Sequence, residues 1–231
     1  VELVKEGIVE GWAQDFYGTP VGTAASDIDF ARPANSVDRD SGMGNLVTDA
    51  YRAKTLTPIG ITANGWISEK IWAGPIVGAD VFHAVSYGFD PETGLGFKLQ
   101  TLELSGADIV AVLEFTLWQS DVFDPDFFLQ TSGLTFRYDS RRDPFDRVLP
   151  ASVRVGGEPL DPAAMYGITV NDGSAALIGL LEDAIGITAV NVTPLPVPEY
   201  VALRDYIEGL GTVAYGTQGR IQDIGRSGKK K

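Results

Sequence analysis

The sequence predicts an α+β fold in which helices pack on layered mixed sheets. Strand-like and helix-like segments are mixed without the regular β-α-β alternation of parallel-sheet proteins. In addition, the pair Gly156-Gly157 is typical of a tight turn between two antiparallel strands. With 231 residues and 44% hydrophobic content, the chain can bury one substantial core, although two small lobes would fit the same length. We therefore expect one main domain.

The N-terminal part is expected to contain one linker helix, one strand and a second helix. Residues 1–17 carry apolar side chains at a spacing of three or four, which predicts an amphipathic helix that ends at Gly18. A short strand is expected over 21–30. A polar loop over 31–44 then leads into a helix at about 45–55.

The next three segments predict a strand, a helix start and another strand. Residues 58–63 are apolar and predict a buried strand, which ends at Asn64-Gly65, a pair that readily adopts positive φ in a turn. Residues 74–82 predict a turn followed by a short helix. Residues 97–104 predict a strand with one wetter face.

The middle of the chain contains the best-defined helix. We expect it over 105–117, because Ser105 can cap its N-terminus and the apolar residues that follow form one stripe. Segments 128–138 and 148–155 predict a pair of strands around a charged connector. A further strand is expected over 166–171.

The C-terminal part predicts a loop, a connector and a last helix. Residues 172–181 are expected to form a loop and helix start, and residues 194–198 a stiff proline-rich connector. A helix is expected over 200–210. The main domain is thus expected over 18–226, and residues 227–231 are expected to be a disordered basic tail.

Composition excludes several classes of partner. The net charge of -13 argues against nucleic acid and against anionic membrane surfaces, which bind clustered Lys and Arg. The chain has no cysteine and therefore no disulfide or thiolate metal site. No window reaches the roughly 18 apolar residues of a membrane span. The start at Val1 has neither an initiator Met nor a signal-peptide pattern, so we expect a processed or excised piece of a longer protein.

No catalytic residue is predicted. The single histidine, His83, cannot supply the several ligands that a two-metal phosphoesterase centre needs. A Ser-His-Asp triad would also have to use His83, and no Gly-x-Ser-x-Gly elbow accompanies it. The glycine-containing run 41–44 lacks the spacing of a phosphate-binding loop.

Several short motifs occur in an order that resembles the C-terminal domain of the 5'-nucleotidase family. That family includes ecto-5'-nucleotidase and the periplasmic UDP-sugar hydrolases. The resemblance runs from about residue 18 to Ile221. Its motifs are Gly44-Asn-Leu-Val-Thr-Asp-Ala50, Ala63-Asn-Gly65 followed by Ala73-Gly74, Phe128-Leu-Gln-Thr-Ser-Gly-Leu134, Val153-Arg-Val-Gly-Gly-Glu-Pro-Leu-Asp161 and Tyr166.

The resemblance implies a division of labour between two domains. In such enzymes an N-terminal metallophosphoesterase domain holds two divalent metal ions, and the C-terminal domain binds the nucleotide. This chain is similar to the second part only, so we expect it to be inactive without the first. The expected partners are a nucleotide or related small molecule and the metallophosphoesterase domain. The resemblance also implies an extracytoplasmic location, either periplasmic or secreted.

The resemblance also implies a substrate-binding site. Asn64 matches the family's base-contacting asparagine, whereas Ser68 stands where the family has a phosphate-binding arginine. Tyr87 takes the place of a stacking phenylalanine. Asp172 begins the stretch that matches the second ligand loop, from which the other stacking aromatic is missing. Arg52 is a remaining cation that could contact phosphate or simply be solvated.

Some alternatives stay open from the sequence. The loss of an arginine at Ser68 also fits a degenerate binding or interaction module that no longer recognises nucleotides. A stand-alone hydrolase is the third alternative. Asn45 and Asp49 are expected to cap or satisfy backbone groups rather than contact ligand. Trp66 and Phe89 could be pocket walls or interface residues.

Overall fold

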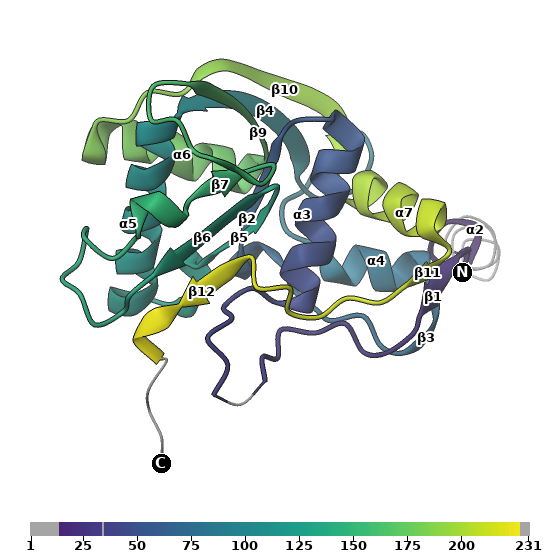
Figure 1. Ribbon diagram of the computed structural model, residues 1–231. Helices are drawn as coiled ribbons and strands as arrows, with labels where there is room; N and C mark the ends of the chain where they lie inside the picture. Colours follow the sequence, from purple (N-terminus) through teal and green to yellow (C-terminus); the bar gives the residue numbers. More distant parts are fainter. Residues whose placement is uncertain (1–13, 34, 227–231) are drawn as a thin grey trace.

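The computed structural model describes residues 14–33 and 35–226 (Figure 1). Most of the expected linker helix over 1–17 and the whole expected tail over 227–231 therefore lie outside the described residues. The helices are α2 (Gln14–Tyr17), α3 (Gly42–Thr55), α4 (Gly78–Ala84), α5 (Gly106–Val122), α6 (Asp172–Ile185) and α7 (Glu199–Leu210), and the 3-10 turns are η2 (Asn64–Trp66), η3 (Pro125–Phe127), η4 (Pro150–Ser152) and η5 (Ile224–Arg226).

The strands form three sheets. The largest has five strands in the order β10-β4-β9-β2-β5, and the others have the orders β11-β1-β3 and β12-β6-β7-β8. Each of the three sheets contains both parallel and antiparallel pairs. The predicted α+β fold with layered mixed sheets is confirmed. The strands are β1 (Pro20–Ala24), β2 (Ile59–Ala63), β3 (Gly74–Val77), β4 (Lys98–Ser105), β5 (Leu129–Ser132), β6 (Leu134–Tyr138), β7 (Arg154–Val155), β8 (Glu158–Pro159), β9 (Met165–Asn171), β10 (Val190–Pro198), β11 (Thr212–Val213) and β12 (Ile221–Asp223).

The five-stranded sheet separates two apolar cores. Ile59 and Ile61 of β2 face the core that α5 and α6 cover. The intervening Gly60 faces α3, where a Cβ atom would lie 2.6 Å from the Thr48 carbonyl oxygen. On that side α3 packs with α4 and α7 around the second core. Helices thus cover both faces of the sheet (Figure 1).

Helix α3 begins earlier than the sequence pattern predicts. Ser41 caps it, because the Gly44 backbone N–H donates to the Ser41 hydroxyl at 3.1 Å. The glycines before Asn45 were expected in a loop, but they form the first turn of the helix. Gly44 is required by packing, since a Cβ atom there would overlap the Gln130 side chain.

The predicted pair of strands is present but divided. Gly133 has φ of +72°, and it breaks the expected strand over 128–138 into β5 and β6, which join different sheets. The antiparallel partner of β6 is the short strand β7, and Gly156-Gly157 turns the chain into β8 as expected.

Two other predicted segments differ from what is found. Residues 194–198 are not a free connector, because they belong to edge strand β10, which pairs with β4. An edge strand tolerates proline, since one side of it needs no N–H donors. The Asn64-Gly65 pair has no positive φ and forms the 3-10 turn η2. Within the described residues, no helix has the length and apolar character needed to cross a bilayer.

Gly133 provides a test of this packing. A Cβ atom there would overlap the Pro58 carbonyl oxygen, and the positive φ would strain any L-residue. Gly133→Ala should therefore lower the free energy of unfolding by about 3 kcal/mol or more. Gly156→Ala is the matched control, because Gly156 also has positive φ but nothing lies near its Cβ position. It should lose only about 1 kcal/mol in urea denaturation. Equal losses would contradict the steric explanation.

Candidate functional site

The predicted site residues can be located from the pairing of two parallel strands. Strand β2 pairs with β9 in parallel, with Ile59 opposite Ile168. Their carboxyl ends therefore lie at the same edge of the sheet, where Asn64 follows β2 and Asp172 follows β9. Ligands of open sheets commonly bind at such an edge. The structure thus brings two of the predicted segments together.

Three aromatic side chains gather at this edge, and we call them the aromatic cluster: Trp66, Tyr87 and Phe97. The Trp66 ring lies 5.6 Å from Tyr87 and 5.4 Å from Phe97, both in edge-to-face geometry. A Cβ atom at Gly173 would lie 2.8 Å from both Trp66 and Phe97. The indole of Trp66 therefore occupies the space in front of Gly173, in the stretch that the sequence resemblance matches to the second ligand loop.

Asn64 is held by three hydrogen bonds. Its side-chain nitrogen donates to the Pro125 carbonyl at 3.2 Å, and its side-chain oxygen accepts from Gln130 at 3.0 Å. Its backbone N–H donates to the Phe128 carbonyl at 2.9 Å. The amide orientation is fixed in this way, with one N–H and one lone pair left for a ligand.

Asp172 is also anchored. One carboxylate oxygen accepts from the Lys98 backbone N–H at 2.9 Å, and the other accepts from the Gln100 amide at 2.7 Å. These bonds join the first turn of α6 to β4. Asp172 also borders a hollow of about 360 Å³ between α6 and the strands β4 and β10.

Arg52 lies elsewhere. It packs beside Gly60 and Gly133, near the start of β2 rather than its end. Its guanidinium donates to the Ser132 hydroxyl at 3.1 Å, while its Nε is buried without a partner among the described residues. Arg52 is thus half-buried and lies away from Asn64, and its contacts tie α3 to β5.

The residues at the remaining family positions are accessible. The Tyr87 side chain is 43% exposed, which leaves part of its ring free to stack. Ser68, which the sequence resemblance places at the position of the family's arginine, donates or accepts one side-chain hydrogen bond, with the Ser86 hydroxyl at 3.1 Å. The side chain at this position is therefore uncharged.

Three arginines lie on the other side of η2. Asn64 borders a cleft of about 190 Å³ that is lined by Arg32, Arg39 and Arg226. The sequence pattern did not indicate these residues, because Arg226 is far from Arg32 and Arg39 in the chain and the three belong to no common motif. Only the return of the C-terminal segment to β6, which places Arg226 here, brings them together.

A buried carboxyl group lies next to the residue that caps α6. Glu199, the first residue of α7, accepts a hydrogen bond from the Tyr51 hydroxyl and weaker ones from Asn171, at 3.4 and 3.5 Å. Asn171 in turn caps α6 by accepting from the Ser174 N–H at 2.8 Å. Burial raises the pKa of Glu199 to about 8, although these hydrogen bonds act to lower it. Glu199 is therefore neutral near pH 7.

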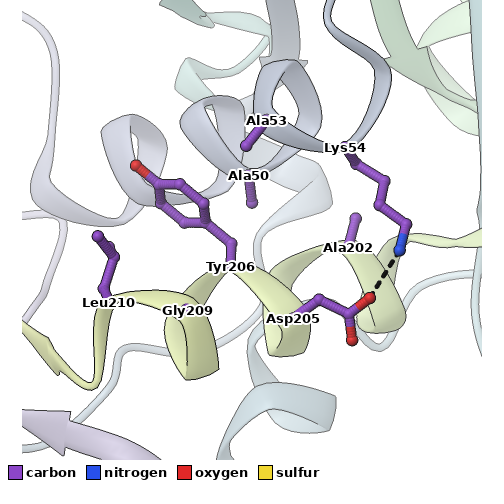
Figure 2. Close-up of a pocket in the computed structure, with 8 residues that line it drawn as sticks. All are labelled: Ala50, Ala53, Lys54, Ala202, Asp205, Tyr206, Gly209 and Leu210. Carbon is purple, nitrogen blue, oxygen red and sulfur yellow. Dashed lines mark hydrogen bonds and ion pairs between the residues drawn. The ribbon is translucent and has the colours of Figure 1, made fainter.

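A separate hollow of about 280 Å³ lies between α3 and α7 (Figure 2). Small residues, among them Ala50, Ala53 and Ala202, line it, and the Lys54–Asp205 ion pair of 2.6 Å closes one end. None of the predicted site residues lies there. Within residues 14–33 and 35–226, no group of three or more His, Cys, Asp or Glu side chains is arranged to hold a metal ion.

Sequence comparison identifies several similar proteins. Residues 20–177 match the family described as 5'-nucleotidase, C-terminal domain. Endonuclease YhcR of Bacillus subtilis is 29% identical over 212 residues, which are 91% of this chain and 16% of YhcR. The cell wall protein Lmo0130 of Listeria monocytogenes is 29% identical over 142 residues, which are 58% of this chain and 17% of Lmo0130.

A similar solved structure is the 5'-nucleotidase precursor from Thermus thermophilus. It superposes with a TM-score of 0.73 and 28% sequence identity, over 96% of this chain and 42% of that chain. The chain thus spans about a sixth of each of the two relatives and less than half of the solved structure.

The neutral Glu199 predicts how stability depends on pH. Its pKa rises from an ordinary value of 4.5 to about 8 on folding. Between these values the folded protein keeps a proton that the unfolded chain has lost, so the free energy of unfolding falls as the pH rises. We expect a fall on the order of a few kcal/mol between about pH 5 and about pH 8, measured by urea denaturation.

Glu199→Gln carries no titratable proton and should remove most of this fall. Glu158→Gln is the control, because Glu158 is an exposed residue of β8 and should leave the slope as in the wild type. A Glu199→Gln variant that loses as much stability as the wild type over the same pH range would contradict the assignment.

Proposed function

The chain belongs to the family of 5'-nucleotidase C-terminal domains, and on that premise we propose that it is the substrate-binding domain of a 5'-nucleotidase-type, metal-dependent phosphohydrolase. In this proposal the domain extends over residues 18–226 and binds a nucleotide or a related phosphorylated small molecule. A separate metallophosphoesterase domain, with two divalent metal ions, carries out the hydrolysis. The chain alone is then not catalytic.

One observation carries this proposal: three separate segments meet at the carboxyl edge of β2 and β9. Turn η2 carries both Asn64 and Trp66. The loop with Tyr87 and the start of α6 at Gly173 both contact Trp66. An accessible aromatic face beside fixed polar groups is suited to a nucleobase, because stacking contributes about 1–3 kcal/mol per base. The edge therefore supports binding rather than bond cleavage.

A second candidate function is an interaction module that has lost nucleotide recognition. Its support is the Trp66 indole, which fills the space in front of Gly173, together with Ser68 at the arginine position. In that case Tyr87 keeps an accessible aromatic face, but the space opposite it at Gly173 is filled by Trp66.

We also propose an extracytoplasmic location. Two similar proteins support it, since one is described as a precursor and the other as a cell wall protein. Phosphohydrolase activity, in this proposal, belongs to a longer protein whose catalytic domain lies outside this chain. The chain covers 42% of the Thermus thermophilus structure and 16% of YhcR, so most of the length of each relative lies outside the matched part.

Calorimetric titration with adenosine, AMP and UDP-glucose tests nucleotide binding. We expect measurable heat with at least one nucleotide, and Tyr87→Ala should weaken its binding roughly tenfold, because a stacking face is removed. Trp72→Ala is the control, since Trp72 is 61% exposed, packs against Lys70 and has no ring contact with the aromatic cluster among the described residues. Absence of binding of all three ligands at millimolar concentration would contradict the proposed function and favour the interaction module.

A further inference from the structure

The cleft beside Asn64 gathers three arginines from two distant parts of the chain. Arg32 and Arg39 come from the loop before α3, and Arg226 ends η5. That loop is held against β12 by a bridge between Asp38 and Gln222. Figure 1 shows the loop and the C-terminal strand on the same side of the molecule. We call this the arginine cleft.

The guanidinium groups of the arginine cleft keep free donors. Arg39 donates its Nε to the Asp38 carbonyl at 2.9 Å, and neither of its terminal nitrogens has a partner among residues 14–33 and 35–226. Arg32 donates to the carbonyls of Arg39 and Phe30, at 2.7 and 3.3 Å, and also keeps one terminal nitrogen free among those residues. Carbonyl partners orient the two groups without neutralising their charge.

The charge in the arginine cleft is only partly compensated, by the nearby carboxylates of Asp40 beside Arg32 and of Asp223 and Asp38 beside Arg39. In a chain with a net charge of -13, neither Arg32 nor Arg39 forms an ion pair within the described part of the chain. Arg226 has one carboxylate partner, Asp223, at 3.4 Å. The acidic residue in the described lining, Asp121, already pairs with Arg147.

The arginines also repel one another. Burial and then the charges of neighbouring arginines lower the pKa of Arg32 and of Arg39 below the usual range. Both groups remain protonated, because arginine does not lose its proton in proteins. A bound anion would offset both the burial and the repulsion.

The cleft is small, with a volume of about 190 Å³. Drug-sized ligands need roughly 300–1,000 Å³. A tetrahedral phosphate group fits, and the planar guanidinium fork is suited to two of its oxygens at once.

We propose that the arginine cleft binds a phosphate group, with Arg39 as the principal contact and Arg32 and Arg226 completing the site. The inference rests on the proposed function, because it assigns the phosphate of the substrate to this cleft. The proposed phosphate-binding residues therefore lie outside the segment with Ser68, where the resemblance places the family's arginine. A free phosphate ion and a phosphate ester share this chemistry.

Titration of the whole chain with inorganic phosphate tests the inference, by calorimetry and thermal shift at a constant ionic strength of about 0.15 M. The wild type should bind, and Arg39→Gln should bind at least tenfold more weakly. Arg39→Lys keeps the charge without the fork and should fall between them. Arg154→Gln is the control with the same charge change, since Arg154 is exposed on β7, and it should bind like the wild type.

Arg226→Gln keeps the inference testable if Arg39→Gln does not fold. The Arg226 side chain is 54% exposed, so its loss should leave the fold intact and weaken phosphate binding about threefold or more. Failure of the wild type to bind phosphate, or binding by Arg226→Gln and Arg154→Gln that equals the wild type, would overturn the inference.

Adenosine and AMP separate this inference from the proposed function. Adenosine has no phosphate, so its binding should be unchanged in Arg39→Gln, whereas AMP binding should weaken at least tenfold. Binding of adenosine without binding of phosphate would overturn the arginine cleft and leave the proposed function standing. Binding of phosphate without binding of adenosine, AMP or UDP-glucose would support the cleft and contradict nucleotide recognition.

Discussion

The fold depends on the carboxylate of Asp49, which joins helix α3, strand β5 and the C-terminal segment. Asp49 lies on α3 and accepts two hydrogen bonds of 2.8 Å from Arg220, one of 2.9 Å from Tyr215 and one from Ser132 of β5. Burial acts to raise the pKa of Asp49, but the hydrogen bonds from Arg220 and Ser132 outweigh it and lower this pKa. The C-terminal segment is held in place by these bonds. It pairs with β1 and β6 and carries Arg226 to the arginine cleft.

The site follows from this arrangement and from the parallel pair β2 and β9. The pair sends Asn64 and Asp172 to one edge, and hydrogen bonds to Gln130 and Gln100 fix both side chains. Turn η2 divides the edge into an aromatic side and a basic side. The aromatic side is partly filled by Trp66, whereas the basic side keeps free donors on Arg39. We propose that this edge contributes a single stacking face and that anion binding comes from the arginine cleft, an arrangement that differs from the family pattern.

Local patterns predicted much of the fold. Strand β2, strand β9, helix α5 with its Ser105 cap and the Gly156-Gly157 turn all follow from short-range periodicity and turn chemistry. The start of α3 could not be predicted, because Gly44 is explained by its contact with Gln130, which is distant in sequence. Strand β10 was not predicted, because its prolines are unusual in strands, although an edge strand tolerates them. The arginine cleft depends on residues 32, 39 and 226, and no local pattern can join them.

The central claim is that ligand binds on both sides of η2. Two-dimensional NMR of the chain, with the amide and arginine Nε signals followed during titration with AMP, tests it most directly. We expect the largest shift changes at Asn64, Trp66, Tyr87 and Gly173 and at the Nε signals of Arg32, Arg39 and Arg226. Changes confined to the hollow between α3 and α7, or no changes at all, would contradict the claim.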